Sequence, residues 1–255
     1  MNVAVITGAS SGIGKEFAEQ LKNNSNIEEF WLIARRKDKL EELANDISKP
    51  CKIICLDLAN QESLNEYSKI LSEEKPNIKY LINAAGYGKY GSYKIVDTET
   101  AFNMIDLNVK AMVYVTQESI PFMNKGAKII QIGSASTYNP LPNMNVYAAS
   151  KSFLKHYSRA LHRELKEIGV SVTTVCPGWV KTDFFGRANI DTDSSHSFAK
   201  PMVLARDVVK KAIKDANKRK DISMYGVYNN FHHLLAKIMP HALLIWLWGN
   251  MQKRK

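Results

Sequence analysis

The chain has few cysteines and no apolar run long enough to cross a bilayer. Its 255 residues include only three cysteines, Cys51, Cys55 and Cys176, which lack the paired spacing of a zinc site. We therefore expect reduced thiols and no bound metal. The most apolar stretch, 238–248, is too short to span a membrane alone. The N-terminus enters the apolar run 3–6 without the features of an export signal, so we expect a cytoplasmic protein.

Acidic residues are also scarce, with 25 Asp and Glu against 35 Lys and Arg, and the formal net charge is +10. The basic residues are spread along the chain, and no dense basic run alternates with aromatic residues. We therefore expect no nucleic-acid partner. The charge is better suited to anionic small ligands, acyl carriers or anionic lipid.

Strand-like and helix-like segments alternate from the first residue onward. This alternation predicts a single α/β domain over residues 1–255, with a doubly wound parallel sheet of the Rossmann type and helices on both faces. The predicted strands are 3–7, 30–34, 52–56, 78–82, 127–132 and 170–175, and the predicted helices begin at Gly12 or cover 37–48, 61–74, 98–123, 146–168 and 205–219. Two further segments are a polar loop without periodicity at about 183–201 and an apolar C-terminal extension at about 225–255.

A glycine-rich turn joins the first predicted strand to the first predicted helix. Residues 7–14 are T-G-A-S-S-G-I-G. Glycines at this junction permit a tight turn and a close approach of the backbone to a ligand, and the helix N-terminus offers free N–H groups to a pyrophosphate. The residues that we expect to bind a dinucleotide here are Gly8, Ser10, Ser11, Gly12, Ile13 and Gly14.

The end of the second predicted strand distinguishes one dinucleotide from another. An acidic residue there accepts hydrogen bonds from the adenosine ribose, whereas an arginine accommodates a 2′-phosphate. The sequence has Ala34 in the acidic position and places Arg35 and Arg36 immediately after it. This predicts NADP(H) in preference to NAD(H). The alternative is that both arginines are solvated loop charges.

Two later strand ends should lie along the same edge of the sheet, because parallel strands share their carboxyl ends. Asp57 and Leu58 follow the third strand, and the sequence N-A-A-G follows the fourth. The expected contacts with the adenine and its ribose are Asp57, Leu58, Asn83, Ala84, Ala85 and Gly86.

A hydroxyl, a phenol and an ammonium group are the candidates for proton transfer. Tyr147 and Lys151 stand four residues apart near the start of a predicted helix, so both project from one face of its first turns. Ser134 follows the fifth predicted strand. A strand end and a helix start therefore bring the three groups together.

Six pieces of sequence, in this order, resemble the short-chain dehydrogenase/reductase family over nearly the whole chain. They are T-G-A-S-S-G-I-G at 7–14, N-A-A-G at 83–86, Asn108, Ser134, Y-A-A-S-K at 147–151 and P-G-W-V-K-T at 177–182. The family usually has N-N-A-G, so Ala84 is a departure that removes a side chain but no catalytic group. The tyrosines at 87, 90 and 93 resemble a bacterial branch of broad ketone reductases.

The resemblance implies a tetrad of Asn108, Ser134, Tyr147 and Lys151. Tyr147 would be the general acid in ketone reduction, with its pKa lowered by Lys151, which would also hold the nicotinamide ribose. Ser134 would bind the substrate oxygen, and Asn108 would position a water. Further cofactor contacts are implied for Pro177, Gly178, Val180 and Thr182, and a substrate lid is implied at about 183–201. Homodimers or homotetramers would form through the helices that carry Asn108 and Tyr147.

The expected activity is hydride transfer between NADP(H) and a ketone or secondary alcohol, with a hydrophobic small molecule such as a steroid or fatty-acyl ketone as substrate. The alternative is a catalytically idle NADP(H)-binding sensor or scaffold. Candidate walls of the substrate pocket are Trp179, Phe184, Phe185, Phe198, Tyr87, Tyr90, Tyr93, Pro140, Pro142 and Met144.

The C-terminal extension has no acidic residue after Asp221, is rich in apolar residues and ends in the basic run 253–255. Three interpretations stay open. A helix hairpin broken at Pro240 could cover the pocket mouth. It could lie in a membrane interface, where tryptophan and basic residues are favoured. It could also pack on its own core or on a neighbouring subunit. No transmembrane span is expected.

Overall fold

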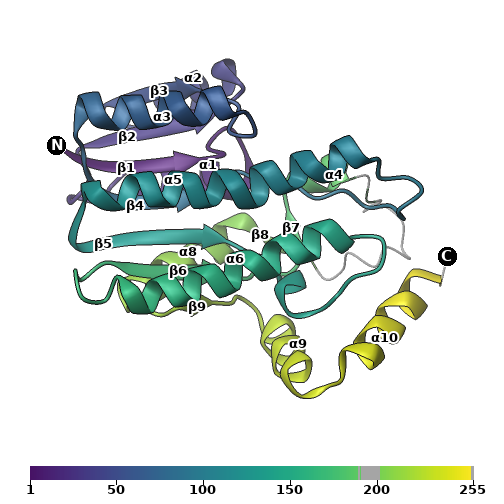
Figure 1. The fold of residues 1–255 in the computed structure, drawn as a ribbon. Helices are drawn as coiled ribbons and strands as arrows, with labels where there is room; N and C mark the ends of the chain where they lie inside the picture. Colours follow the sequence, from purple (N-terminus) through teal and green to yellow (C-terminus); the bar gives the residue numbers. More distant parts are fainter. Residues whose placement is uncertain (189, 191–201, 254–255) are drawn as a thin grey trace.

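The centre of the fold is a seven-stranded parallel sheet with the strand order β3-β2-β1-β4-β5-β6-β9 (Figure 1). The computed structural model describes residues 1–188, 190 and 202–253. The strands of this sheet are β1 Asn2–Thr7, β2 Glu29–Ala34, β3 Cys51–Cys55, β4 Asn77–Asn83, β5 Met123–Ile132, β6 Ser171–Val175 and β9 Ile222–Ser223. The short strands β7 Val180–Lys181 and β8 Val203–Leu204 form a separate parallel pair.

β1 is the strand at which the order of the sheet reverses. Its Val5 is paired with Trp31 of β2 on one side and with Leu81 of β4 on the other. The chain runs outward to β3 from one edge of β1 and to β9 from the other. In open parallel sheets a ligand crevice lies at the carboxyl ends of the strands where the order reverses.

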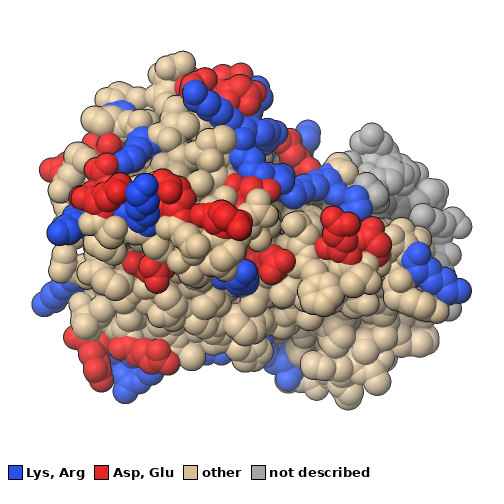
Figure 2. All heavy atoms as spheres, turned by 45° about the horizontal axis from the view of Figure 1, so that its top comes forward, with Lys and Arg blue, Asp and Glu red and all other residues tan. Residues whose placement is uncertain are grey.

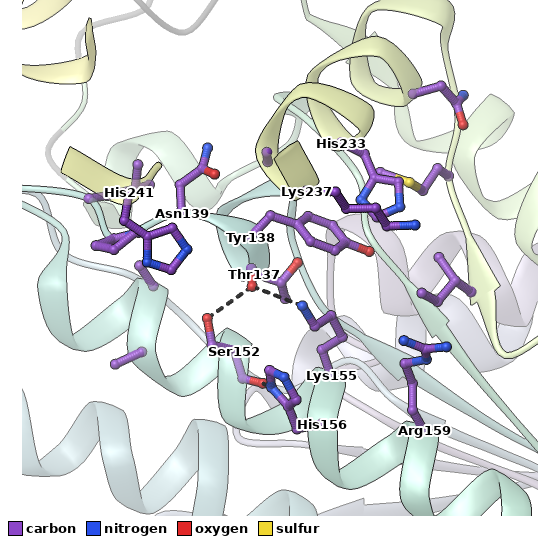
Figure 3. Close-up of a pocket in the computed structure, with 18 of the residues that line it drawn as sticks. Thr137, Tyr138, Asn139, Ser152, Lys155, His156, Arg159, His233, Lys237 and His241 are labelled. Atoms are coloured by element: carbon purple, nitrogen blue, oxygen red, sulfur yellow. Dashed lines mark hydrogen bonds between the residues drawn. The ribbon is translucent and has the colours of Figure 1, made fainter. Parts of the chain in front are cut away.

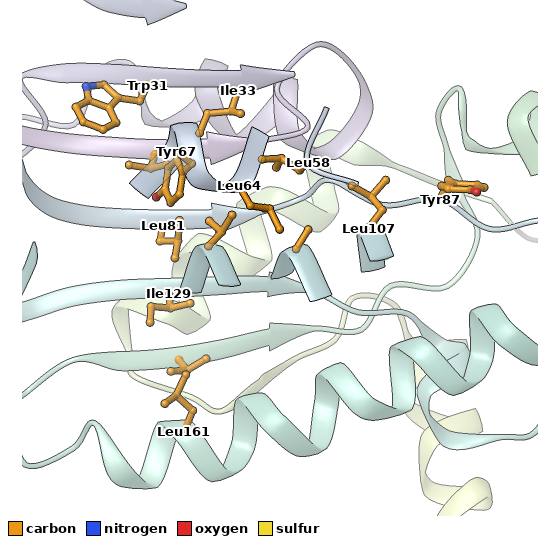
Figure 4. Packing of buried hydrophobic residues seen from close by; sticks show 14 of the residues in the cluster. Trp31, Ile33, Leu58, Leu64, Tyr67, Leu81, Tyr87, Leu107, Ile129 and Leu161 are labelled. Carbon is orange, nitrogen blue, oxygen red and sulfur yellow. The ribbon is translucent and has the colours of Figure 1, made fainter. Parts of the chain in front are cut away.

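Helices cover both faces of the sheet and create two apolar cores. The helices are α1 Gly12–Leu21, α2 Lys37–Asn45, α3 Gln61–Glu74, α4 Thr98–Ile105, α5 Met112–Ser119, α6 Asn145–Glu164, α7 Phe184–Ala188, α8 Ala205–Asn217, α9 Val227–Ile238 and α10 His241–Lys253. Buried residues of α1, α2 and α8 share one core. Those of α3, α5 and α6 form the other, in which Leu64 and Tyr67 of α3 pack with Leu81 and Ile129 of the sheet (Figure 4).

The predicted α/β class and its six strands are confirmed, with differences at three places. The predicted helix 98–123 is divided by a π-helical segment, Asp106–Ala111, and ends in a 3-10 turn before β5. The predicted helix 146–168 ends at Glu164. The seventh strand, β9, was not predicted, because two residues are too few to show strand periodicity.

The C-terminal extension forms a hairpin of α9 and α10 around Met239 and Pro240. Figure 1 shows this hairpin beyond the carboxyl ends of β5 and β6. Within residues 1–188, 190 and 202–253, no helix is both long and apolar enough to cross a bilayer. Basic and acidic side chains are intermixed on the face of the molecule shown in Figure 2.

Candidate active site

A cavity of about 710 Å³ opens at the carboxyl ends of the central strands. It collects nearly all of the predicted site residues into one place. The predicted residues that line it are Gly8, Ser10, Ser11, Gly12, Ile13, Gly14, Arg35, Arg36, Asp57, Leu58, Ala84, Ala85, Gly86, Ser134, Tyr147, Lys151, Pro177, Gly178, Val180 and Thr182. Asn83 and Asn108 lie behind this lining.

The glycine-rich loop has no room for side chains at two positions. Gly8 has φ +66°, and a Cβ atom on it would lie 2.8 Å from the carbonyl carbon of Ala84. A Cβ atom on Gly14 would lie 2.3 Å from the carbonyl oxygen of Gly8. Real side chains do not reach such distances, so the loop is a bare backbone cradle at the N-terminus of α1. This cradle fits a pyrophosphate.

Thr7 joins the glycine loop to the loop after β4. Its hydroxyl oxygen accepts hydrogen bonds from the backbone N–H groups of Ala84 and Ala85, each at 3.1 Å. Asn83 contributes from below the cavity, where its amide donates to the Thr116 hydroxyl at 2.9 Å. Asn83 therefore supports the loop through its side chain rather than lining the cavity. The substitution of Ala84 for the family's asparagine leaves this connection intact.

Three arginines surround the part of the cavity next to the glycine loop. The Arg36 guanidinium donates to the Ser10 hydroxyl at 3.1 Å, and Arg35 Nη1 lies 3.4 Å from Asp57 Oδ2. Arg187 of α7, which the sequence interpretation missed, also lines the cavity and stacks 4.0 Å above the Tyr87 ring centre. Burial lowers the pKa of Arg187, and the nearby Arg35 charge adds to the effect. Arg187 lies in the predicted lid, where no sequence pattern connected it with the other arginines.

Tyr147, Ser134 and Lys151 meet at the floor of the cavity. The Ser134 hydroxyl is close enough to the Tyr147 phenol to lower its pKa. The Lys151 ammonium lies 5.8 Å from the Tyr147 ring centre and donates to the Ile132 carbonyl oxygen at 2.7 Å. Ser134 follows the end of β5, and the last carbonyl group of that strand accepts the hydrogen bond from Lys151. Tyr147 and Lys151 both lie in the first turns of α6.

The pKa values of the two ionisable groups move toward their neutral forms. Burial raises the pKa of Tyr147 to about 12, and the hydrogen bond with Ser134 opposes this rise. Burial lowers the pKa of Lys151 to about 8. The pKa of Tyr147 therefore moves opposite to the direction that the family resemblance implies, because loss of hydration at the buried phenol disfavours the phenolate.

Asn108 lies in the π-helical segment Asp106–Ala111 and is 1% exposed. Its amide oxygen accepts from the Tyr87 backbone N–H at 3.1 Å, and its amide nitrogen donates to the Tyr87 carbonyl at 2.8 Å. A Cβ atom on Gly86 would lie 2.9 Å from Asn108 Oδ1 and 3.4 Å from Lys151 Nζ. Asn108 is thus behind Gly86, adjacent to Lys151, and acts here as a positioning residue for the loop.

Aromatic residues line another part of the cavity. The Phe184 ring centre lies 5.5 Å from that of Tyr147. The ring centres of Trp179 and Phe185 are 5.8 Å apart. Of the other predicted walls, Tyr87 and Met144 line the cavity. Tyr93 is 80% exposed, Pro140 and Pro142 face a second cavity, and Phe198 falls outside the described residues.

The C-terminal hairpin covers this apolar side. Its cavity-lining residues include Leu235, Met239, Leu244, Leu247, Trp248 and Met251. Trp248 stacks on Trp179 with ring centres 6.5 Å apart. Asn143 donates to Gln252 Oε1 at 2.8 Å. These contacts fit the first interpretation of the tail, a cover for the pocket mouth, and also show the tail packed on its own core.

Comparison with known proteins agrees with this geometry. The sequence profile described as short chain dehydrogenase matches residues 2–193. An uncharacterized oxidoreductase of Staphylococcus epidermidis is 31% identical over 182 residues, covering 71% of this chain and 78% of that protein. A short-chain dehydrogenase from Sphingobium yanoikuyae, solved in complex with NADPH, has a TM-score of 0.79 and 25% identity, covering 100% of this chain and 97% of that one. A serine dehydrogenase complexed with NADP+ has a TM-score of 0.75 and 26% identity, covering 88% of this chain and 94% of that one. The chain is an oxidoreductase of the short-chain dehydrogenase/reductase family.

Proposed function

We propose that this protein interconverts a ketone and a secondary alcohol by transferring a hydride to or from NADP(H). The observation that carries the proposal is the shared cavity of the Tyr147 phenol, the Ser134 hydroxyl and the Lys151 ammonium with the glycine cradle. Bound NADPH would supply the hydride. Tyr147 would deliver the proton to the carbonyl oxygen, and Ser134 would stabilise the charge that develops on that oxygen.

NADP(H) is the proposed cofactor because the cavity has basic side chains where an NAD(H) site has an acid. Ala34 offers no carboxylate, while Arg35, Arg36 and Arg187 all line the cavity nearby. The planar guanidinium group is suited to a phosphate. The relatives solved with NADPH and NADP+ support the same choice.

The proposed substrate is hydrophobic. Trp179, Phe184 and Phe185 stand on the substrate side, and the hairpin adds Leu244 and Trp248. Such a lining favours a steroid-like or fatty-acyl ketone over a sugar, because it offers little hydrogen bonding to a polyol.

A homodimer or homotetramer through the helices of Asn108 and Tyr147 is also part of the proposal. The surface of α4 and α6 exposes Phe102, Ile105 and Phe153, and the Phe153 ring stacks on Tyr157. Exposed aromatic residues of this kind are enriched in subunit interfaces. The free thiols of Cys51, Cys55 and Cys176 support a reducing compartment such as the cytoplasm.

NADPH oxidation in the presence of steroid, acyl and sugar ketones tests the activity. We expect turnover on apolar ketones, and we expect Tyr147→Phe to reduce it by ~10²- to 10⁴-fold without loss of NADPH binding. Tyr157→Phe, on the outer side of the same helix, is the matched control. NADPH binding without turnover on any ketone would favour the idle sensor or scaffold instead.

A further inference from the structure

The outer side of the C-terminal hairpin exposes an apolar stripe, which we call the docking face. It consists of Val227, Phe231, Leu234, Ile238, Leu243 and Trp246. The four residues from α9 recur at helical spacing, so they form one continuous row. Ile238 is 73% exposed and Trp246 is 61% exposed. The inner sides of the same helices line the active-site cavity, so the stripe is additional to the apolar surface that the pocket uses.

A second cavity, of about 1030 Å³, lies along another side of the hairpin. It is bounded by α6, by α9 and α10, and by the segment Thr137–Pro142, whose Asn139 and Leu141 also line the active-site cavity. Five of its lining residues are Lys or Arg, and two are Asp. His156, His233 and His241 also line it (Figure 3). The second cavity is therefore cationic.

The acidic residues of the second cavity already have basic partners. Asp221 pairs with Arg159 at 2.8 Å, and Asp215 pairs with Lys211 and with Lys220. Lys155 and Lys237 remain as positive charge beyond those ion pairs. Lys155 stacks 4.2 Å above the Tyr138 ring centre, and burial together with repulsion by Arg159 and Lys237 lowers its pKa. An anionic group in this cavity would relieve that repulsion.

The docking face and the cationic cavity adjoin at one turn of α9. Lys237 lines the cavity, and the next residue, Ile238, belongs to the docking face. The sequence has no acidic residue after Asp221 and ends in Lys253, Arg254 and Lys255. Apolar side chains, a tryptophan and lysines without acids are the composition of a segment that lies in a membrane interface.

We propose that the docking face binds the surface of an anionic phospholipid bilayer, with its apolar stripe among the acyl chains and headgroup phosphates at the cationic cavity. A second copy of the chain fits this surface less well. A two-fold contact would place the same surface against itself and bring Lys155 and Lys237 toward their own copies. The proposal stands on this surface and does not require the proposed reaction.

Vesicle flotation of the full chain tests the proposal, using phosphatidylcholine alone and phosphatidylcholine mixed with phosphatidylglycerol. We expect binding to the mixed vesicles, weaker binding at high salt, and little binding to phosphatidylcholine. Ile238→Glu and Phe231→Glu should each reduce binding at least ~tenfold, and Lys237→Gln should reduce it ~fivefold. Tyr93→Glu, at an exposed aromatic residue that is not part of the hairpin, should leave binding unchanged.

Three controls separate this proposal from its competitors. Thermal unfolding of each variant verifies that the fold is retained, which is expected because the substituted side chains are exposed. Sedimentation at several protein concentrations detects self-association. If Phe231→Glu abolishes self-association and the wild type does not bind vesicles, the docking face belongs to a contact with a second copy and the membrane proposal is overturned. Titration with inorganic phosphate identifies a soluble anion site, and phosphate binding without vesicle binding would overturn the membrane proposal. Equal vesicle binding by wild type and Ile238→Glu would also overturn it.

Discussion

The indole Nε1 of Trp248 donates a 2.9 Å hydrogen bond to the carbonyl oxygen of Pro142. This bond ties the last helix of the chain to the loop that precedes the helix of Tyr147. Gln252 donates to the same carbonyl at 3.1 Å. The helix that covers the cavity is therefore attached at a backbone position just before the helix of Tyr147.

Trp248→Ala should raise the KM for bulky apolar ketones by ~tenfold, because the variant loses the ring stacked on Trp179 and the bond to Pro142. The melting temperature should fall by a few degrees, as expected for a loss of ~1 to 2 kcal/mol. Trp246→Ala is the matched control on the same helix, since Trp246 faces solvent. Steady-state kinetics in detergent-free buffer measures the KM of each variant, and thermal unfolding measures the melting temperature. Equal KM values for the two variants would show that Trp248 does not contribute to the substrate site.

Ser134→Ala should move the pH profile of alcohol oxidation to higher pH. The Ser134 hydrogen bond lowers the pKa of Tyr147 against the effect of burial, so its removal raises that pKa further. Oxidation needs the phenolate, whose fraction falls tenfold for each pH unit below the pKa. Reduction needs the neutral phenol, which is present at neutral pH, so its profile should keep its shape while the rate falls ~10²-fold. The test compares kcat/KM against pH for the wild type, for Ser134→Ala and for the neighbouring control Ser136→Ala. Oxidation profiles of Ser134→Ala and the wild type that superimpose would contradict the role of Ser134.

Lys151→Met should change how stability depends on pH. The pKa of Lys151 is about 8 in the folded protein and near 10.5 when unfolded, so the unfolded chain binds more protons between these values. The wild type should therefore gain up to roughly 3 kcal/mol in the free energy of unfolding as the pH rises from 8 toward 10.5. The variant lacks this gain. Denaturant titrations from pH 7 to 10 measure the free energy of unfolding, and the exposed Lys166→Met is the control. The titrations stop at pH 10, because above it the raised pKa of Tyr147 lowers the free energy of unfolding as the pH rises.

Arg35→Asp should shift the cofactor preference toward NAD(H). The substitution removes a cation beside Asp57 and supplies a carboxylate that can bind a ribose hydroxyl. Loss of a charged hydrogen bond corresponds to a decrease in NADPH affinity of ~tenfold or more. Fluorescence titrations with NADPH and NADH measure the two affinities side by side, and unchanged NADPH affinity would refute a contact between Arg35 and the 2′-phosphate.

Gly14→Ala should lower the affinity for either dinucleotide by at least ~tenfold. The added Cβ atom would lie 2.3 Å from the Gly8 carbonyl oxygen, so the loop must move and the cradle is lost. Gly249→Ala, in α10, is the control because nothing described lies within 4 Å of its Cβ position. Cofactor binding that is equal in the two variants would show that the cradle tolerates a side chain.

Local sequence was sufficient where a site residue follows a strand directly. Gly8, Ala84 and Ser134 each follow an apolar strand, and parallel strands bring their carboxyl ends to one edge. Most of the predicted site residues lie around one cavity for this reason. Asn83 differs because it is the last residue of β4, and its side chain turns away from the cavity toward Thr116.

Contacts between distant segments were beyond the sequence interpretation. Arg187 joins Arg35 and Arg36 only because α7 folds back over the loop of Tyr87. The direction of the Tyr147 pKa shift likewise depends on burial, which a four-residue spacing to Lys151 does not reveal. The three interpretations of the C-terminal extension could not be separated by composition, because apolar residues suit a pocket, a subunit interface and a membrane equally.

The sequence by itself determined the parallel α/β sheet, the glycine cradle and the group of Ser134, Tyr147 and Lys151, because periodicity and strand-end position are local properties. The tertiary structure decided which residues of α9 and α10 face the cavity and which face outward. It also decided that a second, cationic cavity lies beside the first. These features arise from the packing of the hairpin against the segment Thr137–Pro142, some 100 residues earlier in the chain, and long-range packing of this kind leaves no periodic trace in either segment.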